Sequence, residues 1–242
     1  MVDVSRRNAL RGMALTVGAL AGASLTRGGL LDPSDTFAAD PTAKTSLTPE
    51  QAVERLATGN QRFVKDNLRQ PRRDSRRRIA VAEGQAPFAV VLGCADSRVP
   101  PEVVYDEGLG NLFIVRVAGN TAVDPFILGS VEYGTVELGA VLVVVLGHES
   151  CGAVKAAIDV AQNGTELPGD IGAFVAPIVP IAKELIPKTP KSKLVDAVTL
   201  ANIRNAVSNL QQNALLAESI SAGKLEVVGG EYLTKTGKVL VA

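Results

Sequence analysis

Two short apolar runs constrain the fold of this 242-residue chain more than any other feature. They extend from Phe88 to Leu92 and from Ala140 to Leu146, each is followed by a glycine, and both are rich in β-branched residues. Runs of this length and composition are typical of strands that are buried on both faces of a parallel sheet. Because ligands of such sheets gather beyond the carboxyl ends of the strands, a functional site is expected directly after the two runs.

The only two cysteines and the only histidine of the chain lie in the segments that follow these runs. Cys94 begins the first segment, and His148 and Cys151 begin and end the second. Two thiolates and an imidazole are three of the four groups that a tetrahedral zinc requires, so the pattern predicts a zinc site. Asp96 is the obvious fourth group, since in extended backbone it points to the same side as Cys94. Arg98 continues this alternation, and its guanidinium could hold the Asp96 carboxylate away from the metal.

The same residues allow simpler interpretations. The cysteines could form a disulfide that closes a long loop, or they could be two small buried hydrophobes. The histidine could be an ordinary core or surface residue, and Asp96 and Arg98 could form a mere surface ion pair. We favour the metal because all three soft donors fall at predicted strand ends and because the His-x-x-Cys spacing suits one metal.

Two segments resemble the signatures of the β-class carbonic anhydrases. Residues Cys94–Glu102 read Cys-Ala-Asp-Ser-Arg-Val-Pro-Pro-Glu, and residues Gly147–Gly152 read Gly-His-Glu-Ser-Cys-Gly. The similarity extends from about Thr48 to the C-terminus. It implies a zinc lyase, a carbonate dehydratase with one Zn²⁺ per chain, that reversibly hydrates carbon dioxide to bicarbonate and a proton.

The resemblance also implies residue roles. Cys94, His148 and Cys151 would bind zinc, and Asp96 and Arg98 would form the catalytic dyad. Asp96 would in addition be able to serve as the fourth zinc ligand in a closed resting form.

Four further positions match the family's substrate pocket. Gln85, nine residues before Cys94, resembles the side-chain amide that donates to a substrate oxygen. Phe113 and Tyr133 match aromatic wall positions, and Gly152 matches a backbone contact near the metal. For each of these residues, ordinary core or surface packing is the alternative.

The ligand set indicates how the chemistry would depend on pH. Zinc acidifies a bound water, but two thiolates donate charge to the metal, so we expect hydration to favour alkaline pH. Because the chain has no second histidine to relay a proton, Asp96, water and external buffer must carry it to solvent. A helix that begins after Cys151 would stabilise the thiolate of that residue.

Residues 1–39 are interpreted as an export signal and linker. The segment Ser5–Leu10 contains two adjacent arginines and precedes the apolar stretch Met13–Leu25, which is too short to span a bilayer comfortably. This arrangement resembles a twin-arginine signal and predicts contact with the twin-arginine export machinery and delivery to the periplasm or cell envelope. An uncleaved membrane anchor or a chance basic N-terminus is the alternative.

Residues 47–242 are predicted to form one catalytic domain of α/β class, a parallel-rich central sheet flanked by helices. The composition agrees, with 46% hydrophobic residues and 25 basic side chains against 25 acidic ones. This balance argues against nucleic acid as a partner. The arginine-rich run Arg69–Arg78 is interpreted as a solvated face or a subunit contact. The resemblance implies a homodimer or a larger homo-oligomer with active sites at the interface.

The local patterns predict the individual elements. A capping box at Thr48 begins a helix that continues to about Asp66. Further helices are expected over residues 123–138, 153–161, 171–186 and 193–221, and further strands over residues 112–117, 225–228 and 239–241, with a turn at Gly237.

Two other functions remain open on these residues. The first is a hydrolase of carbonyl sulfide or carbon disulfide on the same fold and metal. The second is a non-enzymatic zinc-binding or thiol-redox protein in which Cys94 and Cys151 cycle to a disulfide.

Overall fold

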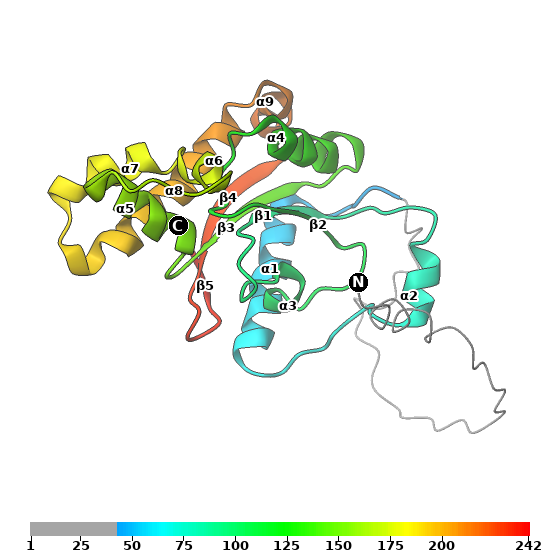
Figure 1. Cartoon of the computed structure of the whole chain (residues 1–242). Coiled ribbons are helices and arrows are strands. Elements are labelled where there is room, and N and C mark those ends of the chain that lie inside the picture. Colours follow the sequence, from blue (N-terminus) through cyan, green and yellow to red (C-terminus); the bar gives the residue numbers. More distant parts are fainter. Residues whose placement is uncertain (1–42) are drawn as a thin grey trace, which may run out of the picture. The chain divides into compact units, whose positions relative to one another are not determined.

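The computed structural model describes residues 43–242. A five-stranded sheet of order β2-β1-β3-β4-β5 forms its centre (Figure 1). The strands are β1 (Ala89–Gly93), β2 (Leu112–Arg116), β3 (Leu142–His148), β4 (Glu226–Tyr232) and β5 (Val239–Val241). The first four are parallel, and β5 pairs antiparallel with β4. The predicted α/β class with a parallel-rich sheet is confirmed, whereas the predicted signal over residues 1–39 lies outside the described part of the chain.

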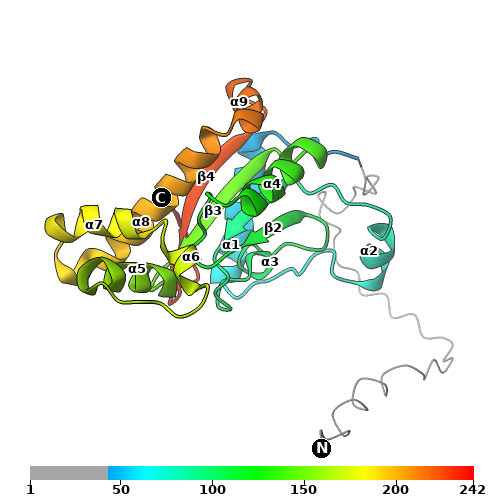
Figure 2. The ribbon, with the colours of Figure 1, turned by 45° about the horizontal axis from the view of Figure 1, so that its top comes forward.

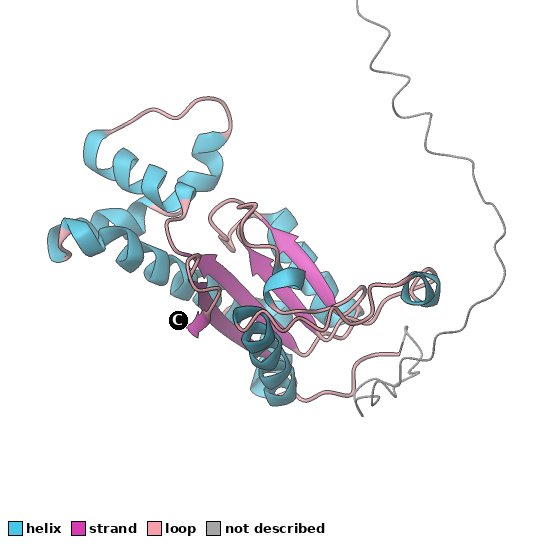
Figure 3. Cartoon of the chain, turned by 90° about the horizontal axis from the view of Figure 1, so that it is seen from below, coloured by secondary structure: helices cyan, strands magenta, loops and turns pink. Residues whose placement is uncertain are grey.

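Helices cover both faces of the sheet (Figure 3). On one face, α1 (Pro49–Val64) and α3 (Pro101–Val104) pack over the strands and bury Leu56 and Val104 in one core cluster. On the other face lie α4 (Pro125–Glu132), α8 (Leu194–Gln211) and α9 (Ala214–Ser221). Strands that are buried on both faces need continuous apolar sequence, which explains the two runs.

A third helical group lies at the carboxyl ends of the strands. It consists of α5 (Gly152–Asn163), α6 (Ile171–Val175) and α7 (Val179–Leu185), which gather at one end of the sheet (Figure 2). Their apolar side chains share a core cluster with Cys94 and Cys151. These helices therefore bury the two cysteines at the strand ends.

The start of α1 follows its sequence signal. The Thr48 side chain accepts from the backbone N–H of Gln51, and the Gln51 side chain accepts from the backbone N–H of Thr48. Pro49 occupies the first helical position, where a missing N–H costs nothing. The predicted capping box is confirmed.

Two predicted helices are each divided in the structure. The helix expected over residues 171–186 is divided into α6 and α7. Ala176 keeps helical backbone, but Pro177 has no N–H to continue the hydrogen-bond ladder of the helix. The helix expected over residues 193–221 is α8 and α9, because the Asn213 side chain accepts from two backbone N–H groups and begins a new helix. In residues 123–138, α4 passes into a π-helical turn, Tyr133–Glu137.

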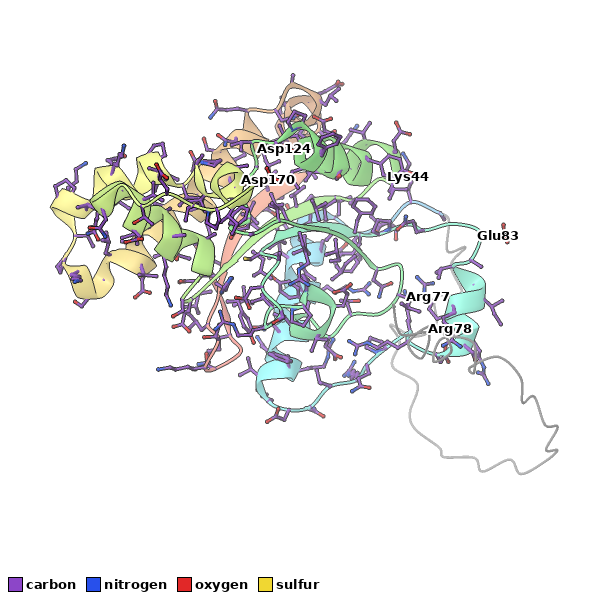
Figure 4. The ribbon with its side chains drawn as sticks, viewed as in Figure 1. Lys44, Arg77, Arg78, Glu83, Asp124 and Asp170 are labelled. Carbon is purple, nitrogen blue, oxygen red and sulfur yellow. The ribbon has the colours of Figure 1, made fainter. Side chains whose placement is uncertain are left out.

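The arginine-rich run contains a short helix that was not predicted, α2 (Ser75–Ala80). Figure 4 labels Arg77 and Arg78 on it, on the side of the molecule away from α5 to α7. Arg73 and Arg77 donate to the backbone carbonyls of Glu107 and Leu109. Part of the run is thus an intrachain contact, while Arg76 and Arg78 are exposed, as expected for a solvated face.

Over residues 43–242, none of the helices combines the length and the apolarity that a bilayer crossing requires.

Candidate metal centre

The predicted metal donors come from the carboxyl ends of two adjacent strands. Cys94 directly follows β1, and His148 is the last residue of β3. The register pairs Gly93 with Leu146, so the two strands end side by side. From β1 the chain continues to β2 on one side, and from β3 it continues to β4 on the other. This reversal of strand order is the position at which open α/β sheets bind ligands.

Cys94, His148 and Cys151 form a compact donor group. Their ligand atoms all lie within 4.8 Å of one another, and their exposed fractions are 4%, 0% and 1%. The two sulfur atoms are 4.0 Å apart and both cysteines are free. A disulfide requires about 2.05 Å, whereas two thiolates on one tetrahedral zinc lie roughly 3.8 Å apart. The donors therefore fit a metal ion and not a disulfide.

The imidazole of His148 is oriented for a metal. Its Nδ1 lies 2.9 Å from the backbone carbonyl oxygen of Glu149, which fixes the ring. Its Nε2 is buried and makes no hydrogen bond to any described residue. A buried ring nitrogen without a partner is costly, and a metal-binding histidine characteristically bonds a backbone carbonyl through its other nitrogen. The unpartnered Nε2 is thus the strongest local sign of a metal ligand.

The surroundings affect the two thiols in opposite directions and favour the thiolate at Cys94. The hydrogen bond with Cys151 lowers the pKa of Cys94, and the backbone N–H of Gly119 also donates to the Cys94 sulfur at 3.4 Å. The same shared hydrogen bond, together with burial, raises the pKa of Cys151. Without metal, the shared hydrogen bond therefore favours the thiolate at Cys94 and the thiol at Cys151. Cys151 stands at the start of α5, where the helix dipole favours negative charge.

Asp96 and Arg98 lie beside the donors. The Arg98 guanidinium donates from Nε to Asp96 Oδ1 at 2.9 Å and from Nη2 to Oδ2 at 2.7 Å. The hydrogen bonds from Arg98 hold the pKa of Asp96 well below its ordinary value. Oδ2 is also 3.8 Å from Nε2 of His148. Asp96 is therefore close enough to reach a metal, but both of its oxygens are bound by Arg98.

Three of the four expected substrate residues, Gln85, Phe113 and Tyr133, are not brought to the metal donors of their own chain. Phe113 and Tyr133 contact each other, with ring centroids 5.9 Å apart. Phe113 is paired with Val90, four residues before Cys94, which corresponds to roughly 13 Å along the strand. Gly152, in contrast, begins α5 directly after the second cysteine.

Gln85 also lies away from the donors. It is exposed and precedes β1, whereas Cys94 follows that strand. It lines a cavity with Arg78 of α2 and with Leu109, and no metal donor lines that cavity. Glu83, two residues earlier, lies on the α2 side of the molecule (Figure 4). The sequence similarity thus assigns Gln85 to a site that its own chain does not place nearby.

One residue at the site was not found from the sequence. Arg116 ends β2 and donates to the backbone carbonyls of Cys94 and Asp96. The only signal was a charged residue near the end of an apolar strand.

Comparison with known proteins agrees with this geometry. Residues 89–239 match the family described as "Carbonic anhydrase". "Carbonic anhydrase 2" of Mycobacterium tuberculosis is 38% identical over 201 residues, which are 81% of this chain and 94% of that protein. "Carbonic anhydrase" of Mycolicibacterium smegmatis is 36% identical over 79% of this chain and 92% of that protein.

Solved structures show the same fold. The β-carbonic anhydrase CcaA superposes with a TM-score of 0.62 at 25% identity, covering 78% of this chain and 87% of that one. One of two tetrameric β-carbonic anhydrases of Sordaria macrospora gives a TM-score of 0.60 at 25% identity, covering 66% and 82%.

An α/β sheet with a Cys₂His donor set at its switch point is typical of a catalytic zinc enzyme, in which the protein supplies three of the four ligands. The chain belongs to the β-class carbonic anhydrases. It is a lyase that reversibly hydrates carbon dioxide to bicarbonate, with one zinc per chain held by Cys94, His148 and Cys151. The alternative of a non-enzymatic zinc-binding or thiol-redox protein is thereby set aside.

Proposed function

We propose that Asp96 and Arg98 are the catalytic dyad of this carbonic anhydrase and that Asp96 works while it is paired with Arg98. Zinc, when bound, supplies a Lewis acid that makes hydroxide available at a much lower pH than in bulk water. The observation that supports the proposal is the two-point contact of Arg98 with both oxygens of Asp96, 3.8 Å from His148 Nε2. This contact leaves the fourth metal position free for water.

The pKa of Asp96 defines its part in the reaction. Because hydrogen bonds from Arg98 keep that pKa well below the ordinary value, the carboxylate stays ionised at working pH. It therefore accepts a hydrogen bond and orients the attacking water, and it does not store the proton. The Asp96 and Arg98 side chains are 20% and 51% exposed, so water and buffer can take the proton from the dyad to solvent.

Stopped-flow carbon dioxide hydration by Asp96→Asn tests this role. We expect a loss of about 100-fold or more, with one zinc per chain retained, because the three principal donors are unchanged. Asp170→Asn, at an exposed aspartate before α6, is the matched control and should keep the wild-type rate. A wild-type rate in Asp96→Asn would exclude Asp96 from the mechanism.

The same proposal concerns substrate choice. Carbonyl sulfide is chemically similar to carbon dioxide, and a zinc enzyme of this kind could also hydrolyse it. Parallel turnover measurements should give a much higher kcat/KM for carbon dioxide, and the reverse order would assign the chain to hydrolysis of carbonyl sulfide.

We infer that the working enzyme is a homodimer or larger and that a second copy supplies Gln85, Phe113 and Tyr133 to each metal centre. These residues do not reach the donors of their own chain. In addition, α4 and its π-helical turn expose Phe126, which is 86% exposed, together with Tyr133 and Val136. Exposed apolar side chains grouped in this way are typical of subunit interfaces. The tetrameric Sordaria macrospora relative supports the inference.

Co-expression of Asp96→Asn with Gln85→Ala tests this arrangement. If Gln85 serves the neighbouring metal centre, each mixed dimer contains one site with both residues intact, and a random mixture should recover about one quarter of wild-type activity. If Gln85 serves its own chain, no mixed dimer has an intact site. Activity no higher than that of the two variants alone would then refute the inference.

We further propose that residues 1–39 direct the protein to the twin-arginine export machinery and to the periplasm or cell envelope. Two thiols that are held by metal before export would be protected from oxidation in that compartment. A fusion of residues 1–39 to a reporter should be exported, and Arg6→Lys with Arg7→Lys should abolish export. A reporter retained in the cytoplasm with the intact segment would contradict the proposal.

A further inference from the structure

Arg116 lies next to the metal site without being a metal ligand or a member of the dyad. It is the last residue of β2, and its guanidinium donates from Nε to the carbonyl oxygen of Cys94 at 2.9 Å. From Nη2 it donates to the carbonyl oxygen of Asp96 at 2.6 Å. One rigid, planar group thus holds two carbonyls of the segment that carries a zinc ligand and the dyad carboxylate.

This segment has few other anchors. The backbone N–H of Ala95 donates to the carbonyl oxygen of Val117 at 3.3 Å. The carbonyl oxygen of Asp96 also accepts from the backbone N–H of Val99 at 3.1 Å. For the carbonyl of Cys94, Arg116 is the only hydrogen-bond donor found among the described residues. A charged donor makes a stronger hydrogen bond than a backbone N–H. Arg116 is therefore the main contact that fixes the Cys94–Ala95 and Asp96–Ser97 peptide groups.

The position of this backbone decides what the Asp96 carboxylate can reach. Its Oδ2 lies 2.7 Å from Nη2 of Arg98 and 3.8 Å from Nε2 of His148. The carboxylate can therefore either pair with Arg98 or bind the metal. A carboxylate is a good zinc ligand. A small movement of the backbone toward the donors would therefore let Asp96 occupy the fourth position.

We propose that Arg116 is a positioning residue that holds the Asp96 segment where the carboxylate meets Arg98 and leaves the fourth metal position free. The inference depends on the proposed role of Asp96 in the paired state. Arg116 touches no reacting atom; it acts through the two carbonyls that it binds.

Binding of thiocyanate to the zinc position tests the proposal with a measurement other than activity. In cobalt-substituted protein, the visible spectrum reports whether the anion enters the fourth position. Arg116→Met should retain one metal per chain and bind thiocyanate at least 10-fold more weakly than wild type, because Asp96 then competes for the metal. Arg116→Lys restores one charged donor and should lie between the two.

The double variant Arg116→Met with Asp96→Asn separates positioning from general damage. It should bind thiocyanate as tightly as Asp96→Asn alone, since no carboxylate is left to compete. Wild-type affinity in Arg116→Met would overturn the proposal, and so would a double variant that stays as weak as Arg116→Met. If Arg116→Met does not fold, wild-type affinity in Arg116→Lys and in a folded Arg116→Gln would overturn it as well.

Failure of the positioning role and failure of the proposed function give different results. If Asp96→Asn keeps wild-type hydration, the role of Asp96 fails, whatever Arg116 does. If Asp96→Asn loses activity while Arg116→Met binds thiocyanate normally, only the positioning role fails.

Discussion

The two buried sulfurs respond to metal and protons together. Zinc requires both thiolates, so protons compete with the metal, and zinc retention should fall as pH is lowered. With zinc bound, we expect a thiol reagent to modify essentially no cysteine. After chelation, it should modify two per chain, more slowly than in denatured protein because Cys94 and Cys151 are buried. Rapid modification of two cysteines per chain in the presence of zinc would contradict the metal site.

A second pH effect is expected at Glu231 of β4. Burial raises its pKa above the ordinary value of 4.5, with further repulsion from Asp196 and Glu149. A carboxyl with a raised pKa favours folding below its unfolded pKa and loses this effect as pH rises through the folded value. At pH 8, the ionised group therefore lowers stability.

Thermal unfolding of Glu231→Gln checks this sign. Its Tm should exceed that of wild type at pH 8, and the difference should shrink as pH falls toward 4.5. Glu166→Gln, in an exposed loop, should show no such trend. A constant difference across the pH range would mean that the effect does not come from ionisation.

Prediction from sequence succeeded best for donors that are chemically rare in this chain. The cysteines and the histidine were distinctive because no others exist, and their spacing after apolar runs placed them together. Arg116 could not be recognised, because its acceptors are backbone carbonyls that every residue carries. Gln85 was assigned through family resemblance alone, which does not state which chain it serves.

At the scale of elements, local signals identified several helices and strands but missed α2 and the breaks inside longer helical segments. The Thr48 capping box predicted the start of α1, and a β-branched run predicted β3. The break between α8 and α9 was missed because apolar spacing continues through Asn213, whose capping depends on its side-chain rotamer. The π-helical turn was missed because the sequence pattern does not distinguish it from an α-helix.

The packing of α1 against α3 gives a prediction at this scale. A Cβ atom at Gly59 would overlap the carbonyl oxygen of Tyr105, which belongs to backbone and cannot rotate away. Gly59→Ala should therefore destabilise the protein by about 1–3 kcal/mol. Gly172→Ala in α6, where a Cβ meets nothing within 4 Å, should change stability by less than about 1 kcal/mol. Denaturant unfolding of both variants checks the contrast, and equal values would refute the close contact.

At the scale of the whole molecule, the alternation of strands and helices predicted the class of the sheet, while the order of its strands came only from the structure. The order matters because it places β1 next to β3 and so makes one site from two distant segments. Sequence reasoning also could not show that Gln85, Phe113 and Tyr133, which the resemblance assigns to the substrate pocket, lie away from the metal donors of their own chain.

The inferred assembly depends on the apolar face of α4. Phe126→Glu puts a charge on a side chain that is 86% exposed in the single chain, so the monomer should fold normally. We expect light scattering to show a smaller assembly and activity to fall with it. Ile171→Glu, at an exposed position in α6, should leave the mass unchanged. An unchanged mass for Phe126→Glu would show that the subunit interface does not include Phe126.

The 4.0 Å gap between Cys94 Sγ and Cys151 Sγ has a practical consequence for handling the enzyme. In metal-depleted protein, a displacement of about 2 Å brings these atoms to bonding distance, and a mild oxidant then removes two donors in one event. Such molecules stay folded, but they do not bind added zinc until a reductant restores the two thiols. The activity that is retained during storage should accordingly depend more on metal saturation and on exposure to air than on the melting temperature.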